Sequence, residues 1–441
     1  MSGFSPVPRV TAWRERWGDI VPLLLAEFIV WLGFGALLPV APLYFTQQGV
    51  DLALLGFVIA AWPAARLVGE PLFGWLADRT DRIPLMVIGL VATGIFSLLP
   101  LLFTGPLALL ILRAGSGFAT AAYEPAARGY LSDATPPERR GEAFGLYGAV
   151  QMGGLVLGPA IGAIGAAWFG GFAFVFAFAA VAAWLAAIPI GQRGRESAVR
   201  THPAPSLDST DFPPEAPSTA RRAAVAVDAD RASRPDASGP RSLWNRGLIA
   251  AMFINAGGYF AAGTYDVIWS LFLQGLGASL HLIGLTFAMF GIPVLLLSPF
   301  AGRLVDRRGS LAFIVIGSIL PALAGLAYTR IADPFLAVPL ILVEATGFAM
   351  LNPALYAVVA ANSPPGRSST AQGIFGAAGT VGFIVASLIA GILAKTDIVY
   401  PMYVFSAVLI GTLVVGLLIG GRWLRGRQVR SPAFDRIASE P

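Results

Sequence analysis

The chain has 441 residues, of which 56% are hydrophobic and only 12% charged, too little polar surface to cover a water-soluble globule. Its formal charge of +5 comes from basic residues gathered at the ends of apolar segments, which indicates membrane topology rather than nucleic-acid binding. The absence of cysteine excludes disulfides, thiolate nucleophiles and cysteine metal sites.

Apolar stretches of about 20 residues recur along the chain, each long enough to cross a bilayer as a helix. They are continuously apolar rather than alternating, which favours helices over a membrane barrel. We therefore predict an all-α polytopic membrane protein. In chain order, the twelve predicted spans are 19–43, 52–76, 83–104, 107–130, 142–167, 171–190, 247–273, 282–303, 311–329, 335–361, 368–394 and 399–421.

A polar segment rich in Pro, Arg and Ser divides the spans into two groups of six, and its composition predicts disorder. The first span is too long for a cleaved signal peptide, so we expect it to remain in the mature protein. Basic residues cluster at both termini and at the even-numbered loops, which places both termini in the cytoplasm. The predicted parts are a cytoplasmic N-terminus (1–18), a six-helix bundle (19–190), a cytoplasmic linker (191–245), a second bundle (246–424) and a cytoplasmic tail (425–441).

The two groups of spans are related by an internal repeat. The run G-W-L-A-D-R at 74–79 recurs as G-R-L-V-D-R at 302–307, an offset of 302 − 74 = 228. At the same offset E-P-A at 124–126 recurs as N-P-A at 352–354. Such a register indicates duplication of a six-span unit. Because six is even, the halves share one orientation and are related by a pseudo-two-fold axis along the membrane normal, with a binding site expected between them.

The loop run G-W-L-A-D-R-T-D-R at 74–82 resembles the signature of the major facilitator superfamily, and the second copy also fits. The resemblance implies two six-helix bundles, a latch in which Asp78 meets a helix of the other half on the cytoplasmic side, and an ion pair between Arg82 and Asp133. Asp81 stands where the family has Gly, and Ile83 where it has a base. The implied gating residues are Gly74, Asp78, Arg79, Arg82, Asp133, Gly302, Asp306 and Arg307.

The fifth span carries small residues at helical spacing, which permit close approach of a neighbouring helix. The pattern resembles the signature of the twelve-helix drug/proton antiporters, except that Ala163 replaces its last Gly. A general packing face is the alternative interpretation. The matching residues are Gly145, Gly154, Gly158, Pro159 and Gly162.

Charged residues are absent from spans 3, 6, 9 and 12 and fall in spans 1, 2, 4, 7 and 10. This distribution indicates that the charged spans line a water-accessible interior. Glu27 lies about 12 Å inside the membrane at 1.5 Å per residue. It is a candidate for reversible protonation or for attracting a cationic substrate, and a satisfied structural carboxylate is the alternative. Arg66 and Glu70, four residues apart, are expected to neutralise each other.

The remaining candidates for proton coupling or substrate binding are Arg113, Glu124, Asp266 and Glu344. Arg113 is expected to pair with an acid of the first span, because an unpaired buried charge is costly. No partner can be assigned to the three acids. Aromatic side chains suit a cavity for amphipathic compounds, although such rings also serve as packing anchors. The candidates are Trp31, Tyr123, Tyr259, Trp269 and Tyr356.

We expect a secondary active transporter of the cell (cytoplasmic) membrane, a multi-pass monomer that exchanges protons for small amphipathic or cationic compounds such as drugs by alternating access. The proton gradient would be the energy source, with no cofactor and no nucleic-acid partner. An uncoupled exporter or facilitator of a sugar, amino acid or lipid is the alternative, and a non-transporting receptor is a remote one. No nucleophile–base pair or phosphate loop supports an enzyme. Neither His202 nor His281 supports a metal cluster.

Overall fold

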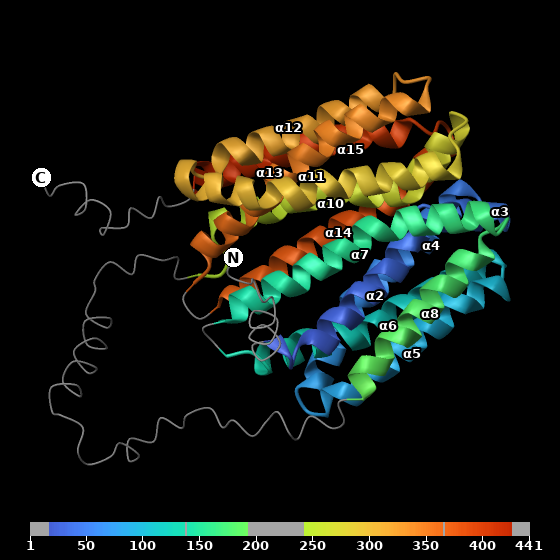
Figure 1. Cartoon of the computed structure of the whole chain (residues 1–441). Coiled ribbons are helices and arrows are strands. Elements are labelled where there is room, and N and C mark those ends of the chain that lie inside the picture. The colour runs from blue at the N-terminus through green and yellow to red at the C-terminus, as the bar shows by residue number, and fades with distance from the viewer. Residues whose placement is uncertain (1–16, 137–138, 193–241, 365–366, 426–441) are drawn as a thin grey trace, which may run out of the picture.

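The computed structural model describes residues 17–136, 139–192, 242–364 and 367–425 (Figure 1). Nearly all of the predicted linker and most of both predicted tails lie outside the described residues. Within them, 11 helices are long and apolar enough to cross a membrane, or 12 if one bent pair counts as a single span. The prediction of an all-α, twelve-span chain is confirmed.

The first bundle follows the predicted spans closely. Because its helices are apolar around most of their circumference, lipid and neighbouring helices solvate them together. The bundle comprises α2 (Val21–Leu37), α3 (Ala41–Gln47), α4 (Leu52–Ala77), α5 (Arg82–Leu98) with the 3₁₀ turn η1 (Leu99–Leu101), α6 (Pro106–Asp133), α7 (Arg140–Trp168) and α8 (Ala173–Gly191).

The second bundle repeats this arrangement. Two of its helices begin with a side-chain cap: the Asn245 side chain accepts a hydrogen bond from Leu248 N–H, and the Ser279 side chain accepts one from Leu282 N–H. The bundle comprises α10 (Arg246–Gly275), α11 (Leu280–Arg308), α12 (Leu311–Tyr328), η4 (Pro334–Leu336), α13 (Ala337–Asn362), α14 (Ser368–Ala394), α15 (Tyr400–Gly420) and η5 (Gly421–Arg425).

One predicted span is broken. The segment predicted as a single span over 19–43 forms α2 and α3, which meet at an angle of 43°. The break falls at residues 38–40 around Pro39, whose nitrogen has no hydrogen to donate to the preceding turn.

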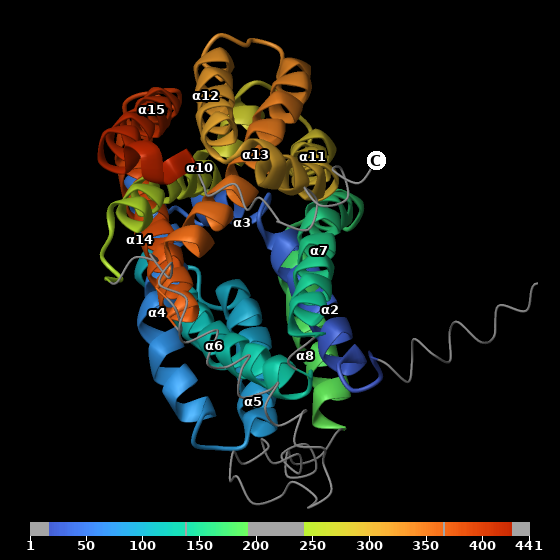
Figure 2. The same ribbon diagram turned by 90° about the vertical axis from the view of Figure 1, so that its left-hand side faces the viewer.

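The bundles lie side by side and touch chiefly through two helix pairs, α4 with α14 and α7 with α11, with smaller contacts of α10 on α3 and α4 (Figures 1 and 2). Both contacts depend on glycine. A Cβ on Gly56 would lie 2.3 Å from the Ser387 carbonyl oxygen, and one on Gly284 would lie 2.8 Å from that of Pro159. These positions obey the repeat, since 284 − 56 = 228 and 387 − 159 = 228. The seams are therefore copies of one ancestral contact.

The seams occupy one end of the molecule, here called the opposite end. There Lys395 Nζ lies 3.2 Å from Asp51 Oδ1, so an ion pair joins the two bundles. The other end, here called the motif end, carries Asp78 and Asp306. At that end α7 and α14 face open space, because a Cβ on any of four glycines would have no neighbouring atom within 4 Å. The four are Gly145, Gly148, Gly373 and Gly376. The bundles are thus closed at the opposite end and separated at the motif end.

Candidate transport site

The glycine face of α7 fixes how the site is built, because it packs directly on the backbone of α2. A Cβ on Gly158 would lie 2.6 Å from the Leu32 carbonyl oxygen, and Gly154 and Gly162 are equally tight against α2. Gly145, which shares the sequence pattern, takes no part, because a Cβ there would meet nothing within 4 Å. Only the middle and opposite-end part of the pattern is a packing face.

This packing surrounds the Glu27 carboxylate, which is fully buried, with hydrogen-bond donors. Trp31 Nε1 donates to Oε1 at 2.8 Å, Gln151 Nε2 donates to Oε1 at 3.0 Å, and the Tyr123 hydroxyl donates to Oε2 at 2.7 Å. These donors come from α2, α7 and α6. All three are neutral, so hydrogen bonds rather than a neighbouring cation satisfy this carboxylate.

Sequence reasoning missed Gln151. It lies three residues before Gly154, which places it on the α7 face that packs on α2. That spacing was the available signal. Tyr123, proposed as a cavity aromatic, is instead buried inside the first bundle with only 1% of its surface exposed.

Glu124 joins a chain of charges between α4 and α6. Its Oε2 accepts from Arg66 Nη2 at 2.7 Å and also from Arg128. Arg66 donates in turn to Glu70, through Nε at 3.0 Å. The expected Arg66–Glu70 pair is therefore present, but it belongs to a larger network that the sequence did not disclose. The charge of Glu124 also acts on Glu27.

Arg113 does not pair with an acid of the first span, so that expectation is wrong. Its electrostatic partner is Asp266 on α10 of the other bundle. Among the residues that the structure describes, no side chain or carbonyl accepts a hydrogen bond from its guanidinium, which lies 5.9 Å from the Trp62 ring. Depth along a helix was predictable from sequence, but the direction in which Arg113 points was not.

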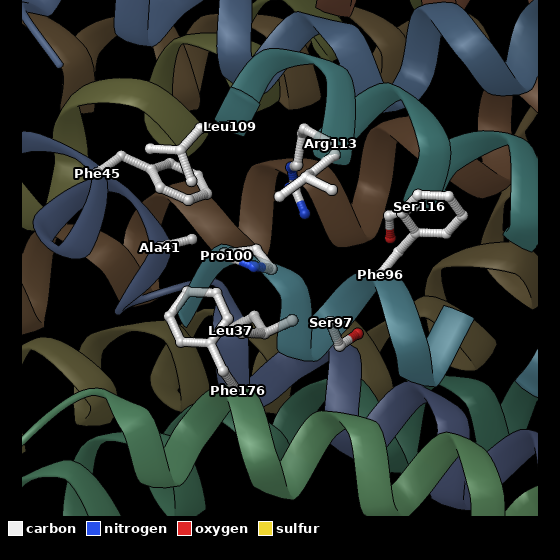
Figure 3. Close-up of a pocket in the computed structure, with 11 residues that line it drawn as sticks. Leu37, Ala41, Phe45, Phe96, Ser97, Pro100, Leu109, Arg113, Ser116 and Phe176 are labelled. Atoms are coloured by element: carbon white, nitrogen blue, oxygen red, sulfur yellow. The ribbon is translucent and has the colours of Figure 1, made fainter. Parts of the chain in front are cut away.

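Arg113 lines two small adjoining chambers inside the first bundle, and Figure 3 shows the one nearer the opposite end. In that view Arg113, Ser97 and Ser116 lie on one side, and apolar side chains such as Phe45 and Leu109 lie on the other.

Glu344 lies in the interior of the second bundle, 2% exposed. The Tyr328 hydroxyl donates to its Oε2 at 2.8 Å. Tyr328 and Trp269 form part of an aromatic cluster, with ring centroids 4.9 Å apart. Glu344 and Trp269 therefore belong to the bundle core rather than to the space between the bundles.

The other aromatic candidates divide by position. Trp31 lines the larger chamber. Tyr259 and Tyr356 are 42% and 52% exposed and interact electrostatically with each other, and Tyr259 also with Arg66 and Arg128 of the first bundle. They face the space between the bundles.

At the motif end the predicted Arg82–Asp133 ion pair is present, at 2.6 Å. Asp78 lies 3.8 Å from Arg82, and its side chain is 75% exposed. Within the described part of the chain, Asp78 makes no hydrogen bond or ion pair with the second bundle, so the latch implied by the resemblance is not formed in this conformation. The repeat is visible here too, because a Cβ on Gly74 would lie 3.8 Å from Pro125 Cβ, and one on Gly302 would lie 3.8 Å from Pro353 Cβ. Arg79 contacts the Trp75 ring at 4.2 Å, whereas Asp306 and Arg307 are exposed.

No group of three or more His, Asp or Glu side chains that could hold a metal occurs among the described residues. His281 is exposed, and His202 lies outside the described residues.

Comparison with solved structures supports the fold. A bacterial homologue of the human lysosomal transporter Spinster, in an inward-facing and occupied conformation, is similar over 97% of this chain and 100% of its own, with a TM-score of 0.71 and 15% identity. A peptide transporter in complex with alafosfalin is similar over 94% of this chain and 96% of its own, with a TM-score of 0.72 and 14% identity.

Two groups of curated relatives are similar over part of the sequence. Quinolone resistance protein NorA of Staphylococcus aureus is 27% identical over 144 residues, which are 33% of this chain and 37% of NorA. Multidrug resistance protein 2 of Bacillus subtilis is 29% identical over 178 residues, which are 40% of this chain and 43% of that protein. The matches span less than half of each relative. The sequence profile of the Major Facilitator Superfamily matches residues 23–272 and 251–437, which is nearly the full length. The chain is therefore a member of that superfamily of membrane transporters.

Proposed function

We propose that the chain is a proton-coupled exporter of small amphipathic or cationic compounds that works by alternating access. The observation that carries the proposal is the environment of Glu27, a buried carboxylate whose oxygens accept hydrogen bonds from the neutral donors Trp31, Tyr123 and Gln151. Such a group can lose or gain a proton without leaving a cation unpaired. The similarity to two resistance proteins supports export of drug-like compounds.

The arrangement of the bundles supplies the route. If the motif end faces the cytoplasm, as the basic residues predict, this conformation is open to the cytoplasm and closed to the outside by the two glycine seams. Substrate then enters between the bundles, where Tyr259 and Tyr356 are exposed. Rocking of the bundles opens the seams and releases the substrate outside.

Glu27 connects the proton to this motion through its contacts with α7. Gln151 on α7 donates to Glu27, and the same helix forms the α7–α11 seam through Val156, Pro159 and Ala163. Protonation weakens the hydrogen bonds that depend on a negative acceptor. A change in the protonation of Glu27 thereby alters the contacts of α7, the helix that helps to close the opposite end.

Glu27→Gln tests the proposal, because the amide keeps the size of the side chain but cannot titrate. In proteoliposomes with an imposed proton gradient, this variant should lose uphill transport of a fluorescent lipophilic cation while it retains downhill flux. Asp397→Asn, an exposed acid beyond α14, is the control and should transport as the wild type does. Undiminished uphill transport by Glu27→Gln would remove Glu27 from the mechanism. Weaker transport of cations alone, with coupling intact, would make it a substrate site instead.

A further inference from the structure

The interior of the first bundle contains a feature that transport of substrate does not use. Two chambers lie among α2, α5, α6 and α8, and four residues line both of them: Leu37, Ser97, Arg113 and Ser116. The larger chamber reaches Glu124, and the smaller reaches Phe45 and Pro100 near the opposite end (Figure 3). Arg113 stands at the junction.

Polar atoms in these chambers lack partners. The Arg113 guanidinium carries five N–H donors. Its Nε is buried without an acceptor, and among the described residues only the charge of Asp266, from the other bundle, acts on it. Glu124 Oε1, buried in the larger chamber's wall, has no donor within the same part of the chain, although Oε2 has two. Buried polar atoms are rarely left unsatisfied, and a guanidinium least of all.

The size of the chambers decides which molecule can satisfy them. The volume open to the centre of a water molecule is about 40 Å³ in the larger chamber and about 20 Å³ in the smaller one. One water needs roughly 10 to 15 Å³ of such volume, whereas a drug-sized ligand needs roughly 300 Å³ or more. Hydroxyl groups of Thr93, Ser97 and Thr120 line the larger chamber as further partners. An anion is disfavoured because the Glu124 carboxylate faces the same space.

We propose that a short chain of ordered water molecules fills these chambers, hydrates Arg113 and joins it to Glu124, and that the fixed positive charge of Arg113 prevents protons from crossing this wet interior. A water chain between Glu124 and the Phe45 region would otherwise conduct protons around the closed seams. A cation at the narrowest point of a water path repels protons, as in other water-filled pores. The inference does not depend on Glu27 or on the identity of the substrate.

Passive proton permeability tests the barrier in substrate-free proteoliposomes that enclose a pH-sensitive dye. Arg113→Gln removes the charge but keeps a hydrated side chain, so dissipation of an imposed pH gradient should accelerate by at least about tenfold, since each 1.4 kcal/mol of lost repulsion is tenfold. Arg113→Gln combined with Ser116→Leu, which fills the junction, should restore the wild-type rate. The controls are Arg330→Gln, at an exposed position, and Thr346→Leu, at a half-buried one, both in the second bundle and away from the chambers.

Proteoliposomes of Arg113→Gln that are as tight as the wild type would overturn the barrier. A leak that persists with Ser116→Leu would overturn its location. Because no substrate is present, neither result depends on whether Glu27→Gln abolishes transport.

Hydroxyl-radical footprinting of the unaltered protein tests the water itself, since radicals form where ordered water touches a side chain. Leu109 and Phe176, buried but lining the smaller chamber, should be oxidised faster than Leu248 and Phe405, which are buried elsewhere. Equal protection of the two pairs would show that the chambers are dry and would end the proposal.

Discussion

Close packing between α2 and α7 should be essential for transport, and Gly158→Leu is the sharpest perturbation of it. A Cβ at this position would lie 2.6 Å from the Leu32 carbonyl oxygen, whereas ordinary contact begins at 3.4 Å. The helices must therefore separate by at least 3.4 − 2.6 = 0.8 Å. Overpacking of this kind costs about 1 to 3 kcal/mol.

The same displacement reaches the Glu27 site. If α7 moves as a rigid helix, the Gln151–Glu27 distance of 3.0 Å lengthens to about 3.8 Å, beyond the range of a hydrogen bond. Hydrogen bonds to charged groups contribute about 1.5 to 3 kcal/mol. Gly158→Leu should thus insert into the membrane, melt at a lower temperature and lose uphill transport.

The assay pairs thermal melting in detergent with proton-driven uptake in vesicles. Gly411→Leu on α15 is the control, because a Cβ there would meet nothing within 4 Å, and leucine favours a helix more than glycine does. It should leave both measurements near wild type. Wild-type melting and transport in Gly158→Leu would show that the glycine face merely fills space and would refute this reasoning.

Two further predictions concern the gate at the opposite end and the topology. A cysteine introduced by Ser387→Cys in this cysteine-free chain reports on the gate through its rate of labelling by an external thiol reagent. Asp51→Lys should raise that rate by at most about fivefold for so exposed a pair, and Asp51→Lys with Lys395→Asp should reverse the effect. Equal rates in both variants would remove the pair from the gate. The hydrogen bond from the Leu54 N–H, and after it the contact with Lys395, lowers the pKa of Asp51 below its usual 3.8. The ionised form therefore persists until pH falls through that lowered pKa. Labelling should respond to salt but not to pH between about 5 and 8. A reporter fused at Ser218 should be active only in its cytoplasmic form, and surface labelling there would refute the predicted orientation.

Hydropathy alone was sufficient to place the helices, because each span must be apolar over the thickness of a bilayer. It could not place the break at Pro39, since proline is tolerated in membrane helices with or without a sharp bend. The repeat offset found in the sequence recurs in the structure as equivalent neighbours, such as Gly74 with Pro125 and Gly302 with Pro353.

The site was less predictable, because contacts depend on how each helix is rotated about its axis. Arg82 and Asp133 were matched through the resemblance to a family. Arg113 was assigned to the wrong helix, because its depth in the membrane allows several partners. The Asp51–Lys395 pair was not anticipated, because residues in different loops carry no spacing that relates them.

The open space beside Gly145, Gly148, Gly373 and Gly376 implies a kind of mutational damage that stability measurements would overlook. A large side chain at any of the four is accommodated in the conformation described here, so folding, expression and melting temperature should remain normal. When the bundles rock and the motif end closes, the same side chain becomes a wedge between the two bundles and holds the transporter in a single conformation. Variants of this kind would accumulate in the membrane as intact but inactive protein.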